Sequence, residues 1–588
     1  SFGRPNTDEY HSRLLSTNKA STFVTRNVYT RGYLTGIKNN ATGANLYNLV
    51  TENARGQVTR ANLGNGFVHT SSYYPNGYVN QMRTYKGGTN AMYMHYASWD
   101  HLKGQLKDRR NKAFGNYRET FTYDSMNRLT RIAGSQNKVH SYNAGGQIKS
   151  NNKIGNYAYN SKFQVSSIAL NGAGNTYYSN YGNRDLTYNA DRKPTYVNVH
   201  SKGKINFTYA PNMERSHAYY GGTHSNINNR RFHKHYSTIM PAEILEDKTE
   251  GTTKFTFFLA GDEYESSIVH IKKIQGNSTQ INEVHYLHRD YLGSILGITN
   301  SSGQVLEKRQ FGAWGSIDAV AGHGGVMNHT SIIDRGFTGH EHFFAEQLIH
   351  MNGRMYDPVI GQFLSPDNFV QDLENTQTFN RYAYAANNPL IYSDPNGEFF
   401  FLIPFVAGAL TAVGIGATAA TFIAAAVIGG ATSVLVNGIG NVLNGQPFFS
   451  GAGNAFALGA ISGVLTFGIG EIGSSLGLAG TTVAHGVVGG FISELSGGDF
   501  IAGFASAAIG HSIAFVSGNL SAHYTRAWRS VVQVASGAIS GGIASKLAGG
   551  SFIMGFKQGF ITSLLNDVAH NKMMSDILEE NYPGEQNR

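Results

Sequence analysis

The chain has 588 residues, of which 14% are charged and 12% aromatic, and its formal net charge is +9. A high aromatic content with a low density of charge excludes a disordered protein. The complete lack of cysteine excludes disulfides, cysteine-ligated zinc and thiol nucleophiles.

The charge is distributed unevenly along the chain. Residues 1–397 contain 41 Lys and Arg against 29 Asp and Glu, a net charge of +12, whereas residues 398–588 contain 6 against 9, a net charge of −3. The basic residues of the first part are scattered and form no dense run. We therefore interpret them as a solvated surface and expect no nucleic-acid partner. The change in composition predicts a domain boundary near Gly397.

Residues 1–115 are polar and rich in aromatic side chains. Runs such as FVTRNVYTRGYLTGI, which starts at Phe23, alternate apolar and polar residues between Gly and Asn. This alternation is typical of half-buried strands. We expect a β-rich segment, in which YASWDHLKGQLKDRR from Tyr96 forms a strand and a charged hairpin rather than a short helix.

A repeat runs through residues 116–333. Each unit has a tyrosine followed by Asn, Asp or Ala, then two to four turn-forming residues, then an alternating strand. The spacings between the tyrosines are 19, 17, 29 and 21 residues, and the tyrosines are Tyr123, Tyr142, Tyr159, Tyr188 and Tyr209. A turn centred on Asn, Asp or Gly between two short strands predicts a β-hairpin. Single hairpins cannot bury their faces, so repeated hairpins must stack or roll up.

His285, His288 and Asp290 alternate near the end of this region, in HYLHRDYLGS. Alternating His and Asp residues could act as metal ligands. On a strand, however, such residues are more often hydrogen-bonded structural groups. We therefore predict neither a metal nor a cofactor.

Residues 334–397 contain turn motifs between short alternating runs. YDPVIG and SDPNG combine a proline, which fixes φ, with Gly or Asn-Gly, which supply positive φ. QFLS and RYAYA alternate as half-buried strands do. These residues by themselves predict a compact, turn-rich β plug.

The motifs FTGHE, MNGRMYDPVIGQFLSPD, NRYAYAANNP and YSDPNG follow one another in this order and resemble the RHS repeat-associated core. The tyrosine-led hairpins resemble the YD repeat, and MNGRMYDP is similar to the version of the core found in Bacteroidota. The resemblance to RHS/YD-repeat proteins implies a mainly β fold, a spiral of hairpins that forms all or part of a hollow shell. In many relatives the shell encloses a toxic C-terminal domain and releases it by self-cleavage.

The resemblance also implies catalytic residues. Relatives cleave themselves with two aspartates, just after a DPxGL sequence, and the matching residues are Asp367 of LSPD and Asp394 of SDPNG. Two carboxylates in one buried site can divide the roles of acid and base. The bond to be cleaved lies in the region of Gly397 and Glu398. Glu398 stands where self-cleaving relatives have Leu, and LSPDN lacks a second proline, so the alternative is that both aspartates only cap turns.

Residues 398–588 have a different composition, rich in Gly and Ala. No charged residue or histidine occurs between residues 399 and 470, and the first apolar run is long enough to span a membrane. Three units repeat at a spacing of 52 residues, with Gly438, Gly490 and Gly542 aligned. We expect three helical hairpins with glycine-zipper packing. They form either a packed bundle or, in the alternative, a structure that inserts into a target membrane.

The acidic tail contains His570 near Asp567 and Asn571, which we interpret as a helix-surface cluster rather than a catalytic site. Four parts are thus expected: a β-rich shell segment (1–115), a hairpin shell (116–333), a core (334–397) and a hydrophobic helical domain (398–588).

The expected function is that of an exported bacterial toxin of the RHS type, secreted or at the cell surface, whose shell encapsulates and delivers the C-terminal domain. The alternative is a cell-surface adhesion scaffold that binds glycans or a protein partner, with the C-terminal helices as a plug. The expected partners are a missing N-terminal shell segment or partner chain, a secretion machinery, an immunity protein and a target membrane. About 400 residues are few for a closed shell, which is why we expect further shell sequence.

Overall fold

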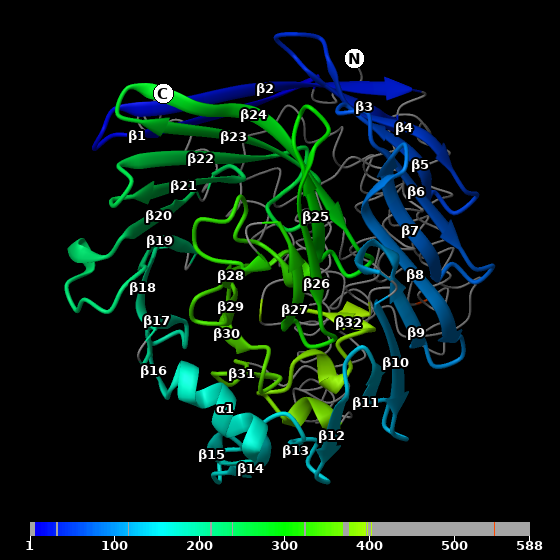
Figure 1. The fold of residues 1–588 in the computed structure, drawn as a ribbon, viewed down its shortest axis with the longest axis vertical. Coiled ribbons are helices and arrows are strands. Elements are labelled where there is room, and N and C mark those ends of the chain that lie inside the picture. Colours follow the sequence, from blue (N-terminus) through cyan, green and yellow to red (C-terminus); the bar gives the residue numbers. More distant parts are fainter. Residues whose placement is uncertain are drawn as a thin grey trace. The chain divides into compact units, whose positions relative to one another are not determined.

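A computed structural model describes residues 6–402 and residue 546, with short gaps at 31–32, 116, 201, 212–213, 238, 323–324, 369–375, 395–396 and 398–400. Residues 6–402 lie in one compact unit, Gly3–Thr418. Its architecture is mainly β, as the sequence predicts, and the strands are antiparallel (Figure 1).

The first large sheet is a meander in which every strand pairs with the next one along the chain. Its fifteen strands are β1 (Thr7–Leu14), β2 (Lys19–Thr30), β3 (Tyr33–Asn39), β4 (Asn45–Glu52), β5 (Val58–Leu63), β6 (Val68–Tyr73), β7 (Val79–Lys86), β8 (Thr89–Asp100), β9 (Gln105–Asn111), β10 (Tyr117–Tyr123), β11 (Leu129–Gly134), β12 (Lys138–Tyr142), β13 (Ile148–Asn151), β14 (Gly155–Tyr159) and β15 (Val165–Leu170). The strand and hairpin predicted from Tyr96 are confirmed by β8 and β9.

The second large sheet has the same meander order and follows the helix α1 (Gly172–Tyr181). Its twelve strands are β16 (Arg184–Tyr188), β17 (Pro194–Val199), β18 (Gly203–Tyr209), β19 (Arg215–Tyr220), β20 (Phe232–Tyr236), β21 (Ala242–Asp247), β22 (Thr252–Leu259), β23 (Ile268–Gln275), β24 (Ser278–Arg289), β25 (Ile295–Thr299), β26 (Val305–Phe311) and β27 (Ile317–Ala321).

Two small sheets follow. One contains β28 (Glu341–Phe343), β29 (Leu348–Met351), β30 (Arg354–Asp357) and β31 (Gln362–Phe363), and the other contains β32 (Tyr392–Ser393) and β33 (Phe401–Leu402). Short 3₁₀ turns complete the described secondary structure at Lys112–Phe114, Ile227–Asn229, Phe337–Gly339, Thr376–Phe379 and Ala385–Asn387.

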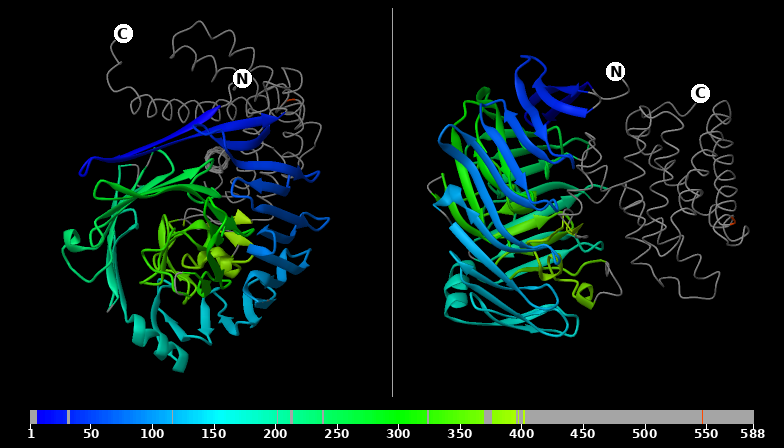
Figure 2. Two further views of the ribbon diagram at one scale, coloured as in Figure 1. Left: turned by 45° about the horizontal axis from the view of Figure 1, so that its top comes forward. Right: turned by 90° about the vertical axis from the view of Figure 1, so that its right-hand side faces the viewer.

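Strands β1–β27 surround the small sheet β28–β31. β2 lies against β22 and β23, and β8 lies against β24, β25 and β26. Figures 1 and 2 show the blue strands β4–β9 along one side, the green strands β20–β23 along the other, and β28–β31 between them. We call β1–β27 the wall and residues 334–397 the inner segment.

The predicted repeat tyrosines have one role in common, which is to tie neighbouring strands together. The hydroxyl groups of Tyr123, Tyr142, Tyr159 and Tyr209 each donate a hydrogen bond of 2.6–2.7 Å to a backbone carbonyl at the start of the preceding strand. Tyr188 instead donates to the carbonyl of Leu364 in the inner segment, at 2.7 Å. A bulge precedes each tyrosine and increases the local twist of the sheet.

The residue after the tyrosine builds the hairpin turn. The Asp124 side chain accepts the N–H groups of Met126 and Arg128, both at 3.0 Å, and Asn143 and Asn160 hold their turns in the same way. Asp and Asn close such turns because their short side chains accept local backbone hydrogen bonds. The predicted hairpin repeat is therefore confirmed, with its chemistry.

The largest hydrophobic cluster among the described residues joins the wall to the inner segment. Trp99 and Leu106 from the wall and Trp314 from the loop after β26 pack with Met351 and Tyr356 from the small sheet. The inner segment is thus part of the main hydrophobic core within residues 6–402.

The predicted boundaries at residues 115, 333 and 397 stay predictions. Of the helical domain expected over 398–588, the structure describes only Lys546 and Phe401–Leu402, and the latter form the short strand β33 instead of a helix. The rest of this region, with its three repeats and the cluster at His570, lies outside the described residues. Among the residues that the structure describes, no helix combines the length and apolar character that crossing a membrane requires.

Candidate active site

The inner segment brings three buried polar residues together at its end. Arg354 opens β30, Asp367 follows β31 in LSPD, and Asp394 follows β32 in SDPNG. The side chains of Arg354 and Asp367 are 5% exposed and that of Asp394 is 1% exposed. Because 26 residues separate the two aspartates, only the tertiary fold brings them together.

One guanidinium nitrogen connects the two carboxylates. Nη2 of Arg354 lies 3.1 Å from Oδ2 of Asp367 and 3.0 Å from Oδ2 of Asp394. The two carboxylate oxygens are therefore no farther apart than the sum of these distances. The predicted pair Asp367 and Asp394 does share one buried site.

The same arginine reaches the peptide bond at the domain boundary. Nε of Arg354 donates a hydrogen bond to the carbonyl oxygen of Gly397. Its Nη1 donates to the carbonyl of Arg381 at 3.1 Å, and its guanidinium group lies 3.6 Å from the ring centroid of Phe363. These contacts fix the plane of the guanidinium group and exclude water from one of its faces.

Gly397 has a conformation and surroundings that require glycine. Its φ is +70°, and a Cβ at this position would lie 1.9 Å from the carbonyl oxygen of Met351. Glycine at this position thus lets the chain pass close to β29 while the Gly397 carbonyl accepts from Arg354. The positive φ predicted for the glycine of this motif is confirmed.

The backbone on both sides of Asp367 is anchored. Its N–H donates to the carbonyl of Arg381 at 2.8 Å, and Nε of Arg381 donates to the Asp367 carbonyl at 2.8 Å. The buried phenol of Tyr384 lies near Asp394, and burial together with the charge of Asp394 raises the pKa of Tyr384 above its ordinary value. The carboxylates are therefore held in a rigid and largely dry setting.

Sequence reasoning placed Asp367, Asp394 and Gly397 in this site but missed Arg354. Glu398 lies outside the described residues. One feature of the sequence could have identified Arg354. In MNGRMYDP this charged residue lies between two apolar methionines, so a strand inside the predicted plug would bury it. A buried arginine needs a carboxylate or carbonyl partner, and here it has both.

The arrangement can support hydrolysis of the bond after Gly397. An arginine N–H on a peptide carbonyl draws electron density to the oxygen and stabilises the negative charge that develops when water attacks. One carboxylate can accept a proton from that water, and a protonated second carboxyl can donate one to the leaving nitrogen.

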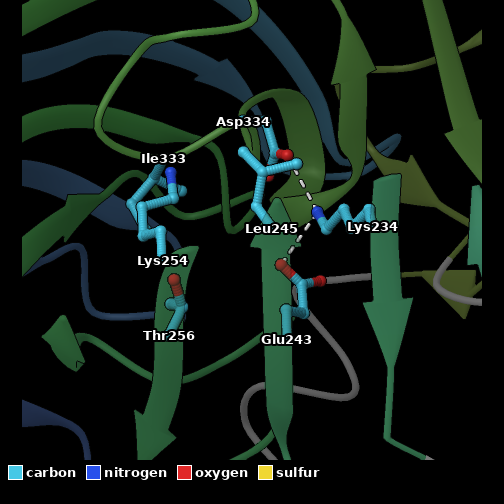
Figure 3. Close-up of a pocket in the computed structure, with 7 residues that line it drawn as sticks. All are labelled: Lys234, Glu243, Leu245, Lys254, Thr256, Ile333 and Asp334. Carbon is cyan, nitrogen blue, oxygen red and sulfur yellow. Dashed lines mark hydrogen bonds and ion pairs between the residues drawn. The ribbon is translucent and has the colours of Figure 1, made fainter. Parts of the chain in front are cut away.

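A second group of buried charges attaches the inner segment to the wall. Nζ of Lys234 on β20 lies 2.8 Å from Asp334, 2.9 Å from Glu243 and 2.7 Å from Glu341. Figure 3 shows Lys234 between Asp334 and Glu243. Arg215 pairs with Glu341, and Arg335 pairs with Glu243. We call these residues the ionic anchor.

The ionic anchor stays charged although it is buried. Burial alone lowers the pKa of Lys234, but the three carboxylates raise it well above its ordinary value. Burial likewise raises the pKa of Glu341, but Lys234 and Arg215 hold it well below 4.5. Lys254, at the other end of the small cavity in Figure 3, donates to the carbonyl of Ile332 at 3.0 Å, and burial lowers its pKa.

His288 and Asp290 have separate structural roles, and His285 contacts the carboxylate of Glu283 at 3.4 Å. His288 contacts the Thr299 hydroxyl at 3.0 Å, and Asp290 accepts the N–H groups of Leu292 and Ser294 at 3.0 and 2.8 Å. Asp290 therefore closes a turn in the way Asp124 does, as the structural interpretation predicts.

Three comparisons place the chain among known proteins. Residues 101–390 match the family model described as Teneurin YD-shell. The tRNA3(Ser)-specific nuclease WapA of Bacillus spizizenii is 28% identical over 125 residues, 21% of this chain and 5% of that protein. The tRNA nuclease WapA of Bacillus subtilis is 28% identical over 119 residues, 20% of this chain and 5% of that protein. The chain thus matches a small part of these relatives.

A solved structure shares the fold. TcdB2-TccC3 without its hypervariable C-terminal region superposes with a TM-score of 0.50 at 16% identity, over 67% of this chain and 23% of that chain. Such a likeness shows the fold alone. It agrees with the family match and with the tyrosine-led hairpins. The assignment to the version found in Bacteroidota stays a prediction. The chain belongs to the RHS/YD-repeat proteins, and its described part is a YD-repeat shell.

Proposed function

We propose that this chain is part of an exported RHS-type toxin, whose shell cleaves its own backbone between Gly397 and Glu398 and thereby frees residues 398–588 as the delivered cargo. The observation that carries the proposal is the contact of Arg354 with both carboxylates and with the Gly397 carbonyl.

The roles follow from the contacts. Arg354 polarises the Gly397 carbonyl and binds the oxyanion. Asp367 and Asp394 share the transfer of protons, one from the attacking water and one to the nitrogen of Glu398. The products are the carboxylate of Gly397 and the free amine of Glu398, so the shell remains intact and the cargo is no longer covalently attached.

Toxin function is supported by the family and by the names of the relatives, which include nucleases and a TcdB2-TccC3 assembly. A secreted or surface location accords with this family. The secretion machinery, an immunity protein, a target membrane and further shell sequence or a partner chain remain expected partners.

Self-cleavage is tested on the complete chain. We expect the purified wild-type protein to yield two fragments, with Glu398 as the new N-terminus by Edman sequencing and intact-mass spectrometry. Asp367→Asn and Asp394→Asn each slow the reaction by a factor of about 100 or more, because general acid or base catalysis contributes this much. Asp357→Asn is the control. Asp357 lies at the end of β30 and, like Asp367 and Asp394, is a buried aspartate that pairs with an arginine, in this case Arg184.

Two results would count against the site. Equal cleavage in wild type and in both aspartate variants would assign processing to another protease. If the wild type is not cleaved at all, Glu398 is the next residue to test. The variant Glu398→Leu restores the residue that self-cleaving relatives have at this position. If that variant also stays intact, the aspartates are structural.

Cargo toxicity is tested separately by producing residues 398–588 in the bacterial cytoplasm and periplasm. Growth arrest with loss of membrane potential supports a membrane-acting toxin. Normal growth and potential in both compartments would instead favour a scaffold whose C-terminal helices form a plug.

A further inference from the structure

Three histidines gather on one face of the second large sheet, away from the candidate active site. His217 lies on β19, and His233 and His235 lie on β20, which is its neighbour in Figure 1. The register pairs His217 with His235, and His233 is two residues from His235, so all three side chains share a face. Lys234, between them in sequence, points the other way into the ionic anchor.

The nitrogen atoms of the three rings lie close together. One ring nitrogen from each histidine falls within 4.8 Å of the other two, and among the described residues this is the one group of three such ligands. A zinc ion sits about 2.0–2.1 Å from each imidazole nitrogen, which places two such nitrogens at most about 4 Å apart. Half-buried rings can close the remaining gap by small rotations about their side-chain bonds.

Neighbouring residues orient the rings as a metal site requires. The carboxylate of Glu246 on β21 contacts Nδ1 of His233 at 3.1 Å and Nε2 of His235 at 2.8 Å. Nδ1 of His217 meets the Thr208 hydroxyl at 3.1 Å. A carboxylate behind a ligating imidazole fixes its tautomer and strengthens it as a ligand.

One nitrogen of the group is already buried without a partner. Nε2 of His233 has no hydrogen bond within the described part of the chain, although it is inaccessible to solvent. Leaving a buried polar group unsatisfied is unfavourable. Its other nitrogen is held by Glu246, so the unsatisfied nitrogen is the one a metal ion would take.

We propose that His217, His233 and His235 bind one zinc-class divalent transition-metal ion, with Glu246 as the supporting carboxylate and water at the fourth position. Three imidazoles favour zinc, copper or nickel over calcium or magnesium, which prefer oxygen ligands. The ion links β19 to β20 and so stabilises the wall beside the ionic anchor.

The test uses the full-length chain without a histidine tag, stripped with EDTA and dialysed against ZnCl₂. We expect about one zinc per chain by mass spectrometry of the metal, and a d–d absorption band of tetrahedral intensity when Co²⁺ replaces zinc. Zinc should also raise the melting temperature of the wild type, because it binds the folded form.

Matched variants identify the ligands. The triple variant His217→Gln, His233→Gln, His235→Gln loses the bound ion and the cobalt band, and Glu246→Gln weakens zinc affinity about tenfold. His200→Gln is the control, since His200 also contacts a carboxylate, that of Asp185 at 2.6 Å, but lies outside the cluster. It keeps wild-type affinity.

Two outcomes would overturn the proposal. The first is a wild-type chain that binds no zinc after stripping and reloading. The second is a triple variant that keeps wild-type stoichiometry and affinity, which would place the ion elsewhere. Limited proteolysis checks that each variant retains the folded wall, so a failure to fold is distinguished from a loss of ligands.

Discussion

The wall and the inner segment of this protein bury their strands in different ways. Wall strands such as β4 and β16 consist mostly of exposed and half-buried residues, as expected for a sheet with one face in water, although β25, which lies against β8, is buried throughout. In β28, β29, β30 and β31, by contrast, every residue is buried, polar ones included. The wall is stabilised by many similar local hairpins, whereas the inner segment depends on charges from distant parts of the chain.

The two regions differ in how well they can hold a functional site. Repeated hairpins give a surface that tolerates change, because each tyrosine and turn acts within its own unit. A buried segment held by ion pairs can keep two aspartates, an arginine and a glycine carbonyl in one fixed arrangement. Such a segment is also easily destabilised, because losing one partner leaves a buried charge unpaired.

The largest expected effect comes from breaking the ionic anchor. Lys234→Met leaves Asp334, Glu243 and Glu341 without their shared cation, and we expect a loss of about 3–5 kcal/mol in the free energy of unfolding. Chemical denaturation gives the total, and hydrogen exchange should show faster exchange in residues 334–397. Lys308→Met, on the half-buried Lys308 of β26, is the control. Unchanged exchange in the inner segment would mean that its packing alone holds it.

Acid should loosen the inner segment. The pKa of Glu341 lies well below 4.5, so its contribution is complete above pH 4.5 and is lost as the pH falls below that value toward the pKa of the folded protein. Buried His342 and His350 also have a pKa far below 6.5, which adds a loss that begins as the pH falls through 6.5.

Hydrogen exchange between pH 7 and pH 3.5, corrected for intrinsic rates, measures this response. We expect protection in residues 334–397 to fall before protection in β3–β5, which contain no histidine. Equal losses in the two regions would contradict an acid response centred on the ionic anchor.

A smaller effect is expected for the repeat tyrosines of the wall. Tyr142→Phe removes the hydroxyl that donates to the Leu129 carbonyl at 2.6 Å, which costs about 1 kcal/mol. The change should stay within its own hairpin in hydrogen exchange. Tyr188→Phe is the informative comparison, because the Tyr188 hydroxyl donates to Leu364 in the inner segment. Its removal should therefore speed hydrogen exchange in the inner segment. Identical exchange patterns in both variants would remove the distinction between local and long-range ties.

The smallest effect is expected at exposed ion pairs of the wall. Asp185→Asn removes the partner of His200, and both side chains are more than half exposed. Solvent screens such pairs, so we expect no measurable change in the denaturation midpoint. A clear loss of stability would show that the outer face of the wall contributes more than its burial suggests.

Much of the wall was determined by the sequence alone. Tyr123 and Asp124, like Tyr142 and Asn143, specify a strand end and a turn through contacts with residues fewer than twenty positions away. Alternation and turn chemistry are local properties, so they can be read without the fold. The motif match also placed Asp367, Asp394 and Gly397 in one site.

Only the tertiary structure decided which distant residues meet. The contact of Arg354 with the Gly397 carbonyl, the seating of Lys234 among three carboxylates and the approach of His217 to His235 each depend on strand register or on packing across the sheets. The spacing of residues along the sequence does not predict such contacts, because a one-residue shift in strand register moves a side chain to the opposite face of the sheet. The sequence therefore determined the hairpins and their turns, and the packing of the inner segment within the wall determined the chemistry.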